Sequence, residues 1–512
     1  MNGTKTRANQ LAYNIKILHT AAWKDHTTSY LAVLSGQESL QSTPNSVLDG
    51  IRRRNLGLSM RLSYGYKERY YLEGSFGYNG SERFAKDHRM GFFPSVGGAW
   101  VVSKEPFLLS SSKWLSFLKL RLSYGKVGND GIINTPRFVH LPSIGQDQPS
   151  GSFRPGLGQI SRYRITGYQN NDVTWEIAEQ ANLGLETKFF NGLFEATVDI
   201  YQQVRHNVLA NRTVIPEAMG LGLQPLDNIG KVRSRGLDFA GKIQHAFNSD
   251  LWVILNGTFT YSKATYLKIE EAADKPEWQW KKGHDISQQV GYIAEGLFRD
   301  QMEIDNSPVQ GGDLMPGDIR YRDINDDGVI DVKDAVHIGF PTTPRIIYGF
   351  NGFINYKGLE FSFAFQGSGQ RGFFINPASI SPFYGNHALL TAIYKDHWSL
   401  DNQAERPLWP RLSTKSITAH NPQEDYTTDK ETRMSTYFLK ECRFLRCTSL
   451  ELGYNLPKKW SRKLALKNLK VYVRANNPFL ISNFDLWDVE LGGNGFNYPI
   501  QKTYSVGLNV NF

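Results

Sequence analysis

The chain has 512 residues, of which 13% are aromatic and 47 are glycine, and it carries a formal net charge of +9. It lacks a run of about 18 or more apolar residues, which excludes a transmembrane helix. The N-terminus, MNGTKTRANQLAYNIKILHT, shows no basic region followed by an apolar core, so no export signal is expected in the chain as written. The positive charge is spread along the sequence without a nucleic-acid-binding motif, so nucleic acid is not an expected partner.

Alternation of apolar and polar residues with a period of two is the dominant pattern, which is typical of β-strands. In chain order it is clearest in MRLSYGY (60–66), FLKLRLSYG (117–125), LKVYVRANN (469–477) and TYSVGLNVNF (503–512). Such strict alternation indicates one strand face in an apolar medium and the other in water. Lysine and arginine on the polar face, as at Lys470 and Arg474, favour a hydrated lumen over a packed core.

Short and long connections between these strands are expected to alternate. Short links are predicted at Lys24-Asp25, Tyr66 to Glu68, residues 104–115, Asn191-Gly192, Asn248 to Asp250, Lys357-Gly358 and residues 457–467. Long segments are predicted near residues 36–52, 80–90, 128–178, 206–232, 264–344, 368–436 and 478–499. Outer-membrane barrels join their strands by short periplasmic turns and long outer loops, whereas compact soluble domains rarely contain loops of this length.

The sequence therefore predicts an all-β fold, an antiparallel transmembrane β-barrel portion of about 15 strands. Bacterial single-chain barrels normally close with an even number of strands. An odd count predicts that the first strands of a larger barrel lie outside this chain.

The segment DINDDGVIDVKD, residues 323–334, has the spacing of a twelve-residue calcium loop, with Gly328 at the sixth position, where the chain must turn sharply. The expected ligands are Asp323, Asn325, Asp327, the Val329 carbonyl, Asp331 and Asp334. Asp334 replaces the longer glutamate that usually closes such a loop. Its flanks contain prolines and no helical period, which excludes an EF-hand. The alternative is an Asx-rich turn held by its own side chains.

Several longer segments resemble the SusC/RagA family of TonB-linked outer-membrane transporters, in family order and through almost the whole chain. They include DVTWEIAEQANLGLETKFFNGLFEATVDIY, PGDIRYRDINDDGVIDVKD, RFLRCTSLELGYNLP and YPIQKTYSVGLNVNF. The resemblance implies a barrel of about 22 strands closed by an N-terminal plug. It also implies import of oligosaccharides or peptides, a SusD-type surface lipoprotein as lid, and TonB as a partner through the missing N-terminal part.

The same resemblance implies how the chain is organised. Residues 1–512 correspond to a partial barrel domain without a plug domain, and residues 264–344 correspond to a long outer loop that carries the calcium-like segment. Calcium is the one cofactor that the resemblance suggests. The location implied is the outer membrane of a Gram-negative, Bacteroidetes-like bacterium, in contact with its lipid. The terminal apolar row resembles the signal read by the barrel assembly machinery: Tyr504, Val506, Leu508, Val510 and Phe512.

No catalytic motif is present, since the chain contains neither HExxH nor GxSxG, so an enzyme is not expected. The expected function is TonB-dependent nutrient import, with this chain supplying the C-terminal barrel part. Two alternatives remain open: a soluble, β-rich, calcium-dependent glycan-binding module, and an inactive gene fragment. Substrate-binding residues stay unidentified, because loop aromatics can either stack on sugar rings or pack the loops: Trp278, Trp280, Phe374, Phe383, Tyr384 and Trp398.

Overall fold

The computed structural model describes nine stretches of the chain, residues 8–41, 51–111, 113–131, 138–147, 162–221, 223–384, 387–421, 434–463 and 466–511. The chain divides into two compact units. The first comprises Met1–Leu237 and Ala264–Ala273, and the second comprises Asp238–Lys263 and Asp274–Phe512. Among the described residues, no helix has the length and apolar character needed to cross a membrane.

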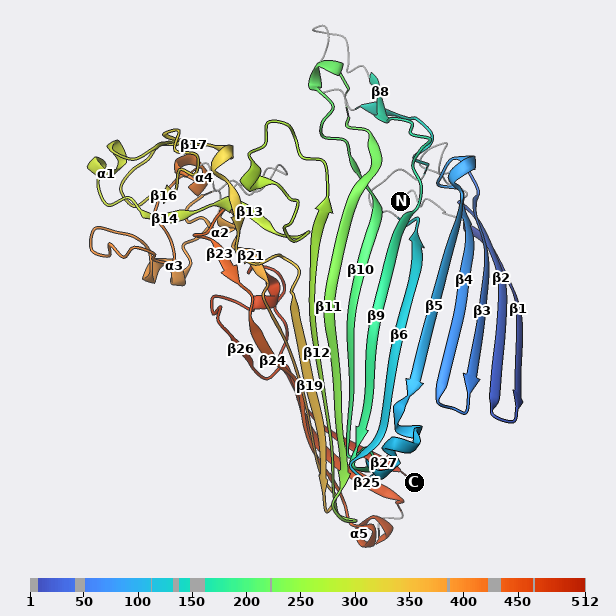
Figure 1. Cartoon of the computed structure of the whole chain (residues 1–512). Helices are drawn as coiled ribbons and strands as arrows, with labels where there is room; N and C mark the ends of the chain where they lie inside the picture. The colour runs from blue at the N-terminus through green and yellow to red at the C-terminus, as the bar shows by residue number, and fades with distance from the viewer. Residues whose placement is uncertain are drawn as a thin grey trace, which may run out of the picture. The chain divides into compact units, whose positions relative to one another are not determined.

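Long antiparallel strands dominate the first unit and lie side by side in Figure 1. They are β1 (Ala8–Trp23), β2 (His26–Gln41), β3 (Arg53–Tyr66), β4 (Tyr70–Ser81), β5 (Met90–Val101), β6 (Leu115–Asn129), β9 (Glu176–Phe189) and β10 (Phe194–Asn211). The strands β11 (Leu226–Ala246) and β12 (Leu251–Lys268) contribute residues to both units.

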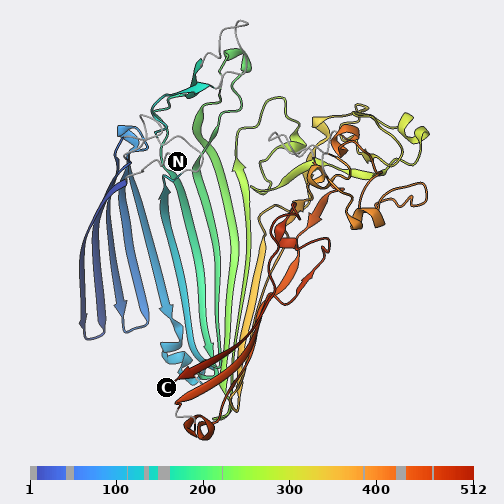
Figure 2. The same cartoon turned by 180° about the vertical axis from the view of Figure 1, so that it is seen from behind.

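The second unit continues the same antiparallel pattern with β19 (Ile346–Tyr356), β20 (Leu359–Gly369), β24 (Phe444–Asn455), β25 (Asn468–Asn476) and β27 (Thr503–Asn511). Hydrogen bonding orders the sheet β1-β2-β3-β4-β5-β6-β9-β10-β11-β12-β19-β20-β24-β25-β27, with β26 (Leu480–Ser482) beside β24, so that the sheet has 16 strands. The C-terminal strands β25 and β27, in red, lie next to each other in Figure 2.

Short strands and helices occupy connections between the long strands. In the first unit, β7 (Ser143–Asp147) pairs with β8 (Arg162–Gly167). The second unit adds β13 (Gln289–Tyr292), β14 (Ala294–Leu297), β15 (Val309–Gln310), β16 (Ile319–Tyr321), β17 (Val329–Ile330), β18 (Val336–Ile338), β21 (Gly372–Phe374), β22 (Met434–Ser435) and β23 (Leu439–Glu441). Its helices are α1 (Gln301–Asp305), α2 (Pro377–Ile380), α3 (Thr391–Lys395), α4 (Ile417–His420) and α5 (Lys458–Lys463).

The described residues also form short 3-10 helices. They are η1 (Lys86–His88), η2 (Val102–Lys104), η3 (Pro106–Ser111), η4 (Phe190–Gly192), η5 (Glu217–Met219), η6 (Glu277–Gln279), η7 (Val332–Asp334) and η9 (Val489–Leu491).

One face of the long strands exposes rows of apolar side chains. Residues that are directly paired across strands share a face, so the register defines each row. In the first unit, one row contains Tyr64, Leu72, Leu122, Leu183 and Ile200, all of which are exposed. In the second unit, one row contains Phe361, Leu452, Val473 and Val506, and another contains Tyr356, Leu359, Tyr454, Val471 and Leu508. Apolar rows exposed over many strands are the surface expected toward lipid.

The structure confirms the predicted antiparallel all-β fold and the alternation of connection lengths. Each predicted short link joins two consecutive strands, and at one of them Lys357 and Gly358 have φ of 51° and 85°. A two-residue hairpin with positive φ at both positions has the twist that antiparallel strands require. In the second unit, the connections 269–345 and 370–443 leave the opposite end of the strands from the Lys357-Gly358 turn. The short strands inside these connections were not predicted.

Candidate functional site

The polar face of the strands carries charged side chains that pair with each other. In the first unit, Arg121 on β6 contacts Glu186 at 2.6 Å and Asp199 at 3.2 Å. Arg121 borders a hollow of about 470 Å³ that Lys119 and Asn182 also line. Paired but partly solvated ions are the expected lining of a wet conduit, since unpaired charges are costly where water is scarce.

The same arrangement recurs in the second unit. Lys470 on β25 lies 2.6 Å from Glu360 on β20 and 3.0 Å from Glu451 on β24, and Arg474 also pairs with Glu451. Lys470 and Arg474 therefore lie on the polar strand face, as the sequence predicted. Tyr472, between them on the same face, has both cations near its ring.

The long connections of the second unit form what we call the loop domain, the described residues within 274–345, 370–443 and 477–502. Figure 1 shows most of its short strands and helices gathered together, with β26 beside β24. The three connections share one hydrophobic core, in which Ile319, Met434 and Val489 are fully buried. Because each connection supplies core residues, the loop domain is a packed structure and its parts hold each other in place.

A buried carboxylate joins two of these connections. Asp318, just before β16, is fully buried, and its Oδ1 accepts hydrogen bonds from Arg411 Nε at 2.8 Å and His420 Nδ1 at 2.7 Å. Its Oδ2 accepts from the backbone N–H of Met315 at 2.9 Å. A buried charge must be paired and hydrogen-bonded to be tolerated, and Asp318 is both. Sequence reasoning missed this cluster, because its members are about a hundred residues apart and form no local motif.

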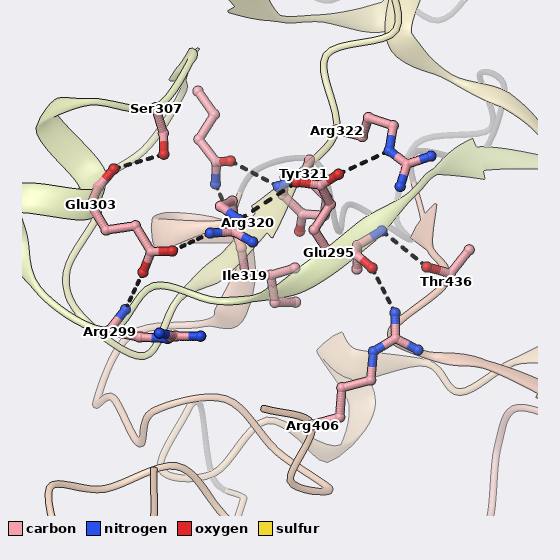
Figure 3. Close-up of polar contacts among 12 residues, drawn as sticks. Glu295, Arg299, Glu303, Ser307, Ile319, Arg320, Tyr321, Arg322, Arg406 and Thr436 are labelled. Carbon is pink, nitrogen blue, oxygen red and sulfur yellow. Dashed lines mark hydrogen bonds and ion pairs between the residues drawn. The ribbon is translucent and has the colours of Figure 1, made fainter. Parts of the chain in front are cut away.

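A second ionic cluster surrounds the β14–β16 hairpin and is drawn in Figure 3. Arg320 on β16 pairs with Glu303 on α1 and lies 3.6 Å from Glu295 on β14. Arg322 Nε donates to Glu295 at 2.9 Å. Glu303 also accepts from the backbone N–H of Arg299 at 2.7 Å, so α1 is tied to the hairpin from two sides.

The third connection is fixed by an arginine of the sheet. Arg446 on β24 is 4% exposed, and its Nη2 donates to the two carboxylate oxygens of Asp488 at 2.5 and 2.7 Å. It also donates to Glu490, in η9. Hydrogen bonds between charged groups are stronger than those between neutral groups, so Arg446 holds residues 488–490 against β24.

The calcium-like segment folds around its own side chains. Asp323 Oδ2 accepts from Gly328 N at 2.8 Å, and Asp331 Oδ1 accepts from Lys333 N at 2.7 Å. Asp334 is fully buried and accepts from Ile324 N and Asp331 N, each at 2.8 Å. Gly328 has φ of 80°, a left-handed conformation that favours glycine at this sharp turn.

Its surroundings exclude an EF-hand, as predicted, because the segment lies between the strands β16 and β18. The Trp278 indole donates to the Lys333 carbonyl at 2.8 Å and so anchors the end of the segment. Burial raises the pKa of the Asp334 carboxyl, although the N–H groups of Asp331 and Ile324 oppose this shift. Among the described residues, no group of three or more His, Cys, Asp or Glu side chains is arranged to hold a metal ion. One oxygen of the segment, Asp323 Oδ1, is buried without a hydrogen-bond partner.

The loop aromatics divide into two groups. Phe374 and Trp398 belong to the hydrophobic core of the loop domain, so they are unsuited to stacking on a substrate. The others are exposed: Trp278, Trp280, Phe383 and Tyr384. The loop domain also contains an apolar cavity of about 250 Å³, lined by Trp409, Trp487 and Phe438 among others.

The predicted assembly signal lies on β27. Tyr504, Val506, Leu508 and Val510 are exposed on one face of this strand, whereas Phe512 lies outside the described residues. The alternation predicted from the sequence is therefore present where the structure describes it. Its use as an assembly signal stays a prediction.

Comparison with known proteins places the chain in a family. Residues 4–511 match the family described as "TonB dependent receptor-like, beta-barrel". TonB-dependent receptor P26 of Formosa agariphila is 29% identical over 477 residues, covering 88% of this chain and 45% of the relative. TonB-dependent receptor SusC of Bacteroides thetaiotaomicron is 27% identical over 466 residues, covering 88% of this chain and 43% of the relative.

A solved structure, that of the RagAB peptide transporter, superposes on 99% of this chain and 56% of its own with a TM-score of 0.74 and 21% identity. At that identity the likeness concerns the fold. This chain spans about half the length of the curated relatives it matches. The resemblance to SusC/RagA proteins is confirmed, and the chain belongs to the TonB-dependent receptor-like β-barrel family, whose members reside in the outer membrane.

Proposed function

We propose that this chain supplies barrel wall and outer loops to a TonB-dependent importer of oligosaccharides or peptides. The observation that carries the proposal is that the two faces of the sheet differ. One face exposes apolar rows such as Phe361-Leu452-Val473, and the opposite face carries paired charges such as Lys470-Glu451. One face suits lipid and the other suits a hydrated conduit. The loop domain would then form part of the outer binding surface.

The substrate class and the partners belong to the same proposal. SusC and the RagAB peptide transporter are the relatives on which oligosaccharide or peptide import rests. A SusD-type surface lipoprotein would close over the loop domain, and TonB would supply energy through a part of the full-length transporter outside this chain. The barrel assembly machinery would recognise the apolar row of β27.

The test is uptake by whole cells that express the full-length transporter from its own gene. Cells would receive labelled oligosaccharides and labelled peptides of matched size, with TonB present or deleted. We expect uptake of one of the two classes, abolished by deletion of TonB. Equal uptake without TonB would indicate a passive pore, and no uptake of either class would favour a binding module or an inactive fragment.

A soluble glycan-binding module is the weaker alternative. It requires two sheets whose apolar faces pack together and bury each other. The long strands instead leave large apolar side chains exposed, with Val506 at 76% and Leu508 at 66%. Such rows would cause aggregation in water, whereas lipid would cover them.

We further propose that the segment 323–334 binds calcium and stiffens the connection in which it lies. The residues that would hold the ion are Asp323, Asn325, Asp327, the Val329 carbonyl, Asp331 and Asp334, whose oxygen donors suit calcium. Each carboxylate oxygen has two lone pairs, so accepting one backbone N–H leaves capacity for a cation. The buried, unpartnered Asp323 Oδ1 supports the proposal because an uncompensated buried oxygen is otherwise costly.

Calcium is therefore expected to protect residues 274–345 from protease in the full-length transporter in detergent, relative to the same sample with chelator. Binding to the folded state at about 100 times the dissociation constant stabilises it by about 2.7 kcal/mol. The double variant Asp323→Ala and Asp327→Ala should lose the protection, while the matched variant Asp300→Ala and Asp305→Ala, at α1, should keep it. Equal cleavage with calcium and with chelator in the unmodified protein would identify the segment as an Asx-rich turn only.

A further inference from the structure

The turn between β24 and β25 carries an unusual concentration of positive charge. Its sequence from 457 to 467, PKKWSRKLALK, contains five basic residues and no acidic one. Lys458, Lys459, Lys463 and Lys467 are exposed, and none of them forms an ion pair with another described residue. The charge of this turn is therefore not neutralised within the described part of the protein.

Charges in some other short turns are paired. In the first unit, Lys104 pairs with Glu68, and Arg69 pairs with Glu105. On the polar face beside this turn, Lys470 is likewise matched by two glutamates. Three other short links each carry one exposed lysine without an ion pair among the described residues: Lys24, Lys113 and Lys357. The turn between β24 and β25 differs because four such lysines lie close together, and this concentration suits a partner that supplies negative charge.

Backbone hydrogen bonds hold the two described ends of the turn. Pro457 begins it, and the Pro457 carbonyl accepts from Trp460 N at 2.8 Å and Ser461 N at 3.2 Å. Ser461 is 1% exposed, so one side of α5 packs inward. Lys467 N donates to the Asn511 carbonyl at 2.8 Å, which ties the end of the turn to β27. Trp460, in the middle, is 60% exposed.

The position of the turn relative to lipid follows from the register. Tyr454 belongs to the exposed apolar row Tyr356-Leu359-Tyr454-Val471-Leu508, which is the last such row before the turn. Lys458 follows four residues later, a span of at most roughly 14 Å. Figure 1 shows α5 at the end of β24 that lies opposite β26 and the loop domain. Because short turns of such barrels are periplasmic, the lysines lie at the level of the inner-leaflet headgroups.

We propose that Lys458, Lys459, Trp460, Lys463 and Lys467 form a docking site for anionic phospholipid headgroups of the periplasmic leaflet. The lysine ammonium groups would contact lipid phosphates, while the Trp460 ring would insert at the boundary between headgroups and acyl chains. Basic residues combined with an exposed tryptophan are the combination expected for binding at a membrane surface. The proposal depends on membrane location and on the register, and it is independent of which substrate is transported.

The experiment is native mass spectrometry of the full-length transporter in detergent, titrated with phosphatidylglycerol or with phosphatidylcholine of the same acyl chains. The unmodified protein should retain phosphatidylglycerol preferentially. The quadruple variant K458Q/K459Q/K463Q/K467Q should bind it at least about tenfold more weakly, since each basic residue near an anionic lipid contributes to the attraction. Trp460→Ala should cause a smaller loss.

Two control variants separate this site from general charge effects. The quadruple variant K281Q/K282Q/K333Q/K395Q removes four exposed lysines from the loop domain and should bind phosphatidylglycerol normally. Replacing the four turn lysines with arginine should also preserve binding, because the charge is kept. Unchanged affinity of the turn glutamine variant would overturn the proposal. Displacement of the lipid by soluble glycerol phosphate would also overturn it. The proposal would equally fail if the turn glutamine variant lost a periplasmic protein partner while its lipid binding stayed intact.

Discussion

Replacing Asp318 with alanine is expected to release the connection 370–443 from the connection 269–345. Arg411 and His420, with side chains 16% and 3% exposed, would lose the carboxylate that they share. Removing one partner of a buried ion pair destabilises a structure by about 3–5 kcal/mol, because the remaining charge stays buried and uncompensated. The loss should fall on the loop domain, since the sheet hydrogen bonds do not involve Asp318. Limited proteolysis and thermal unfolding of the full-length transporter would measure it.

The control uses a surface pair between the same two connections. Lys415 lies 2.8 Å from Asp313, and their side chains are 63% and 74% exposed. The Lys415 hydrogen bond lowers the pKa of the Asp313 carboxyl, but exposed pairs contribute little to stability. Asp313→Ala should therefore leave the cleavage pattern unchanged. The double variant Asp318→Ala and Arg411→Met should recover part of the lost stability. If Asp318→Ala and the unmodified protein were cleaved identically, Asp318 would not be what joins the two connections.

Replacing Leu452 with arginine is expected to impair insertion of the full-length transporter into the outer membrane. Leu452 is 51% exposed and lies between Phe361 and Val473 in an apolar row. An arginine on the lipid face destabilises a barrel by about 2–4 kcal/mol at the bilayer midplane and by less near the interfaces. Urea unfolding in lipid vesicles, together with the amount of folded protein in the outer membrane, would measure the effect.

Ser362→Arg is the matched control on the neighbouring strand. Ser362 is paired with Glu451 on the polar face, where an arginine would meet a carboxylate and water. We expect this variant to insert as well as the unmodified protein. If Ser362→Arg were the more damaging of the two, the assignment of lipid-facing and water-facing sides would be reversed.

Local sequence signals predicted the strands and their turns because those elements depend on neighbouring residues. The alternation in TYSVGLNVNF encodes which side chains of β27 share a face, and the structure exposes Tyr504, Val506 and Leu508 together. Lys357-Gly358 encodes a tight turn because its conformation requires residues that accept positive φ. Residues 323–334 likewise predict a sharp turn at Gly328 from spacing alone.

The interior of the loop domain had no comparable signal. The sequence left open whether Phe374 and Trp398 stack on substrate or pack the loops. The structure places both in the core, and burial of this kind depends on what packs against them from distant segments. The same holds for the short strands, such as β13, which pairs with both β18 and β22. Strands of three or four residues show too few alternations to predict, and their partners lie far away in the chain.

The sequence by itself determined the two-faced strands and the alternation of short and long connections. These features follow from residue spacing and composition, which need no knowledge of long-range contacts. Only the tertiary structure decided that Asp318 meets Arg411 and His420, and that Arg446 holds Asp488. Such pairs form because segments about 40 to 100 residues apart in the sequence bury each other. The local sequence around a charged residue does not predict which partner this burial will bring to it.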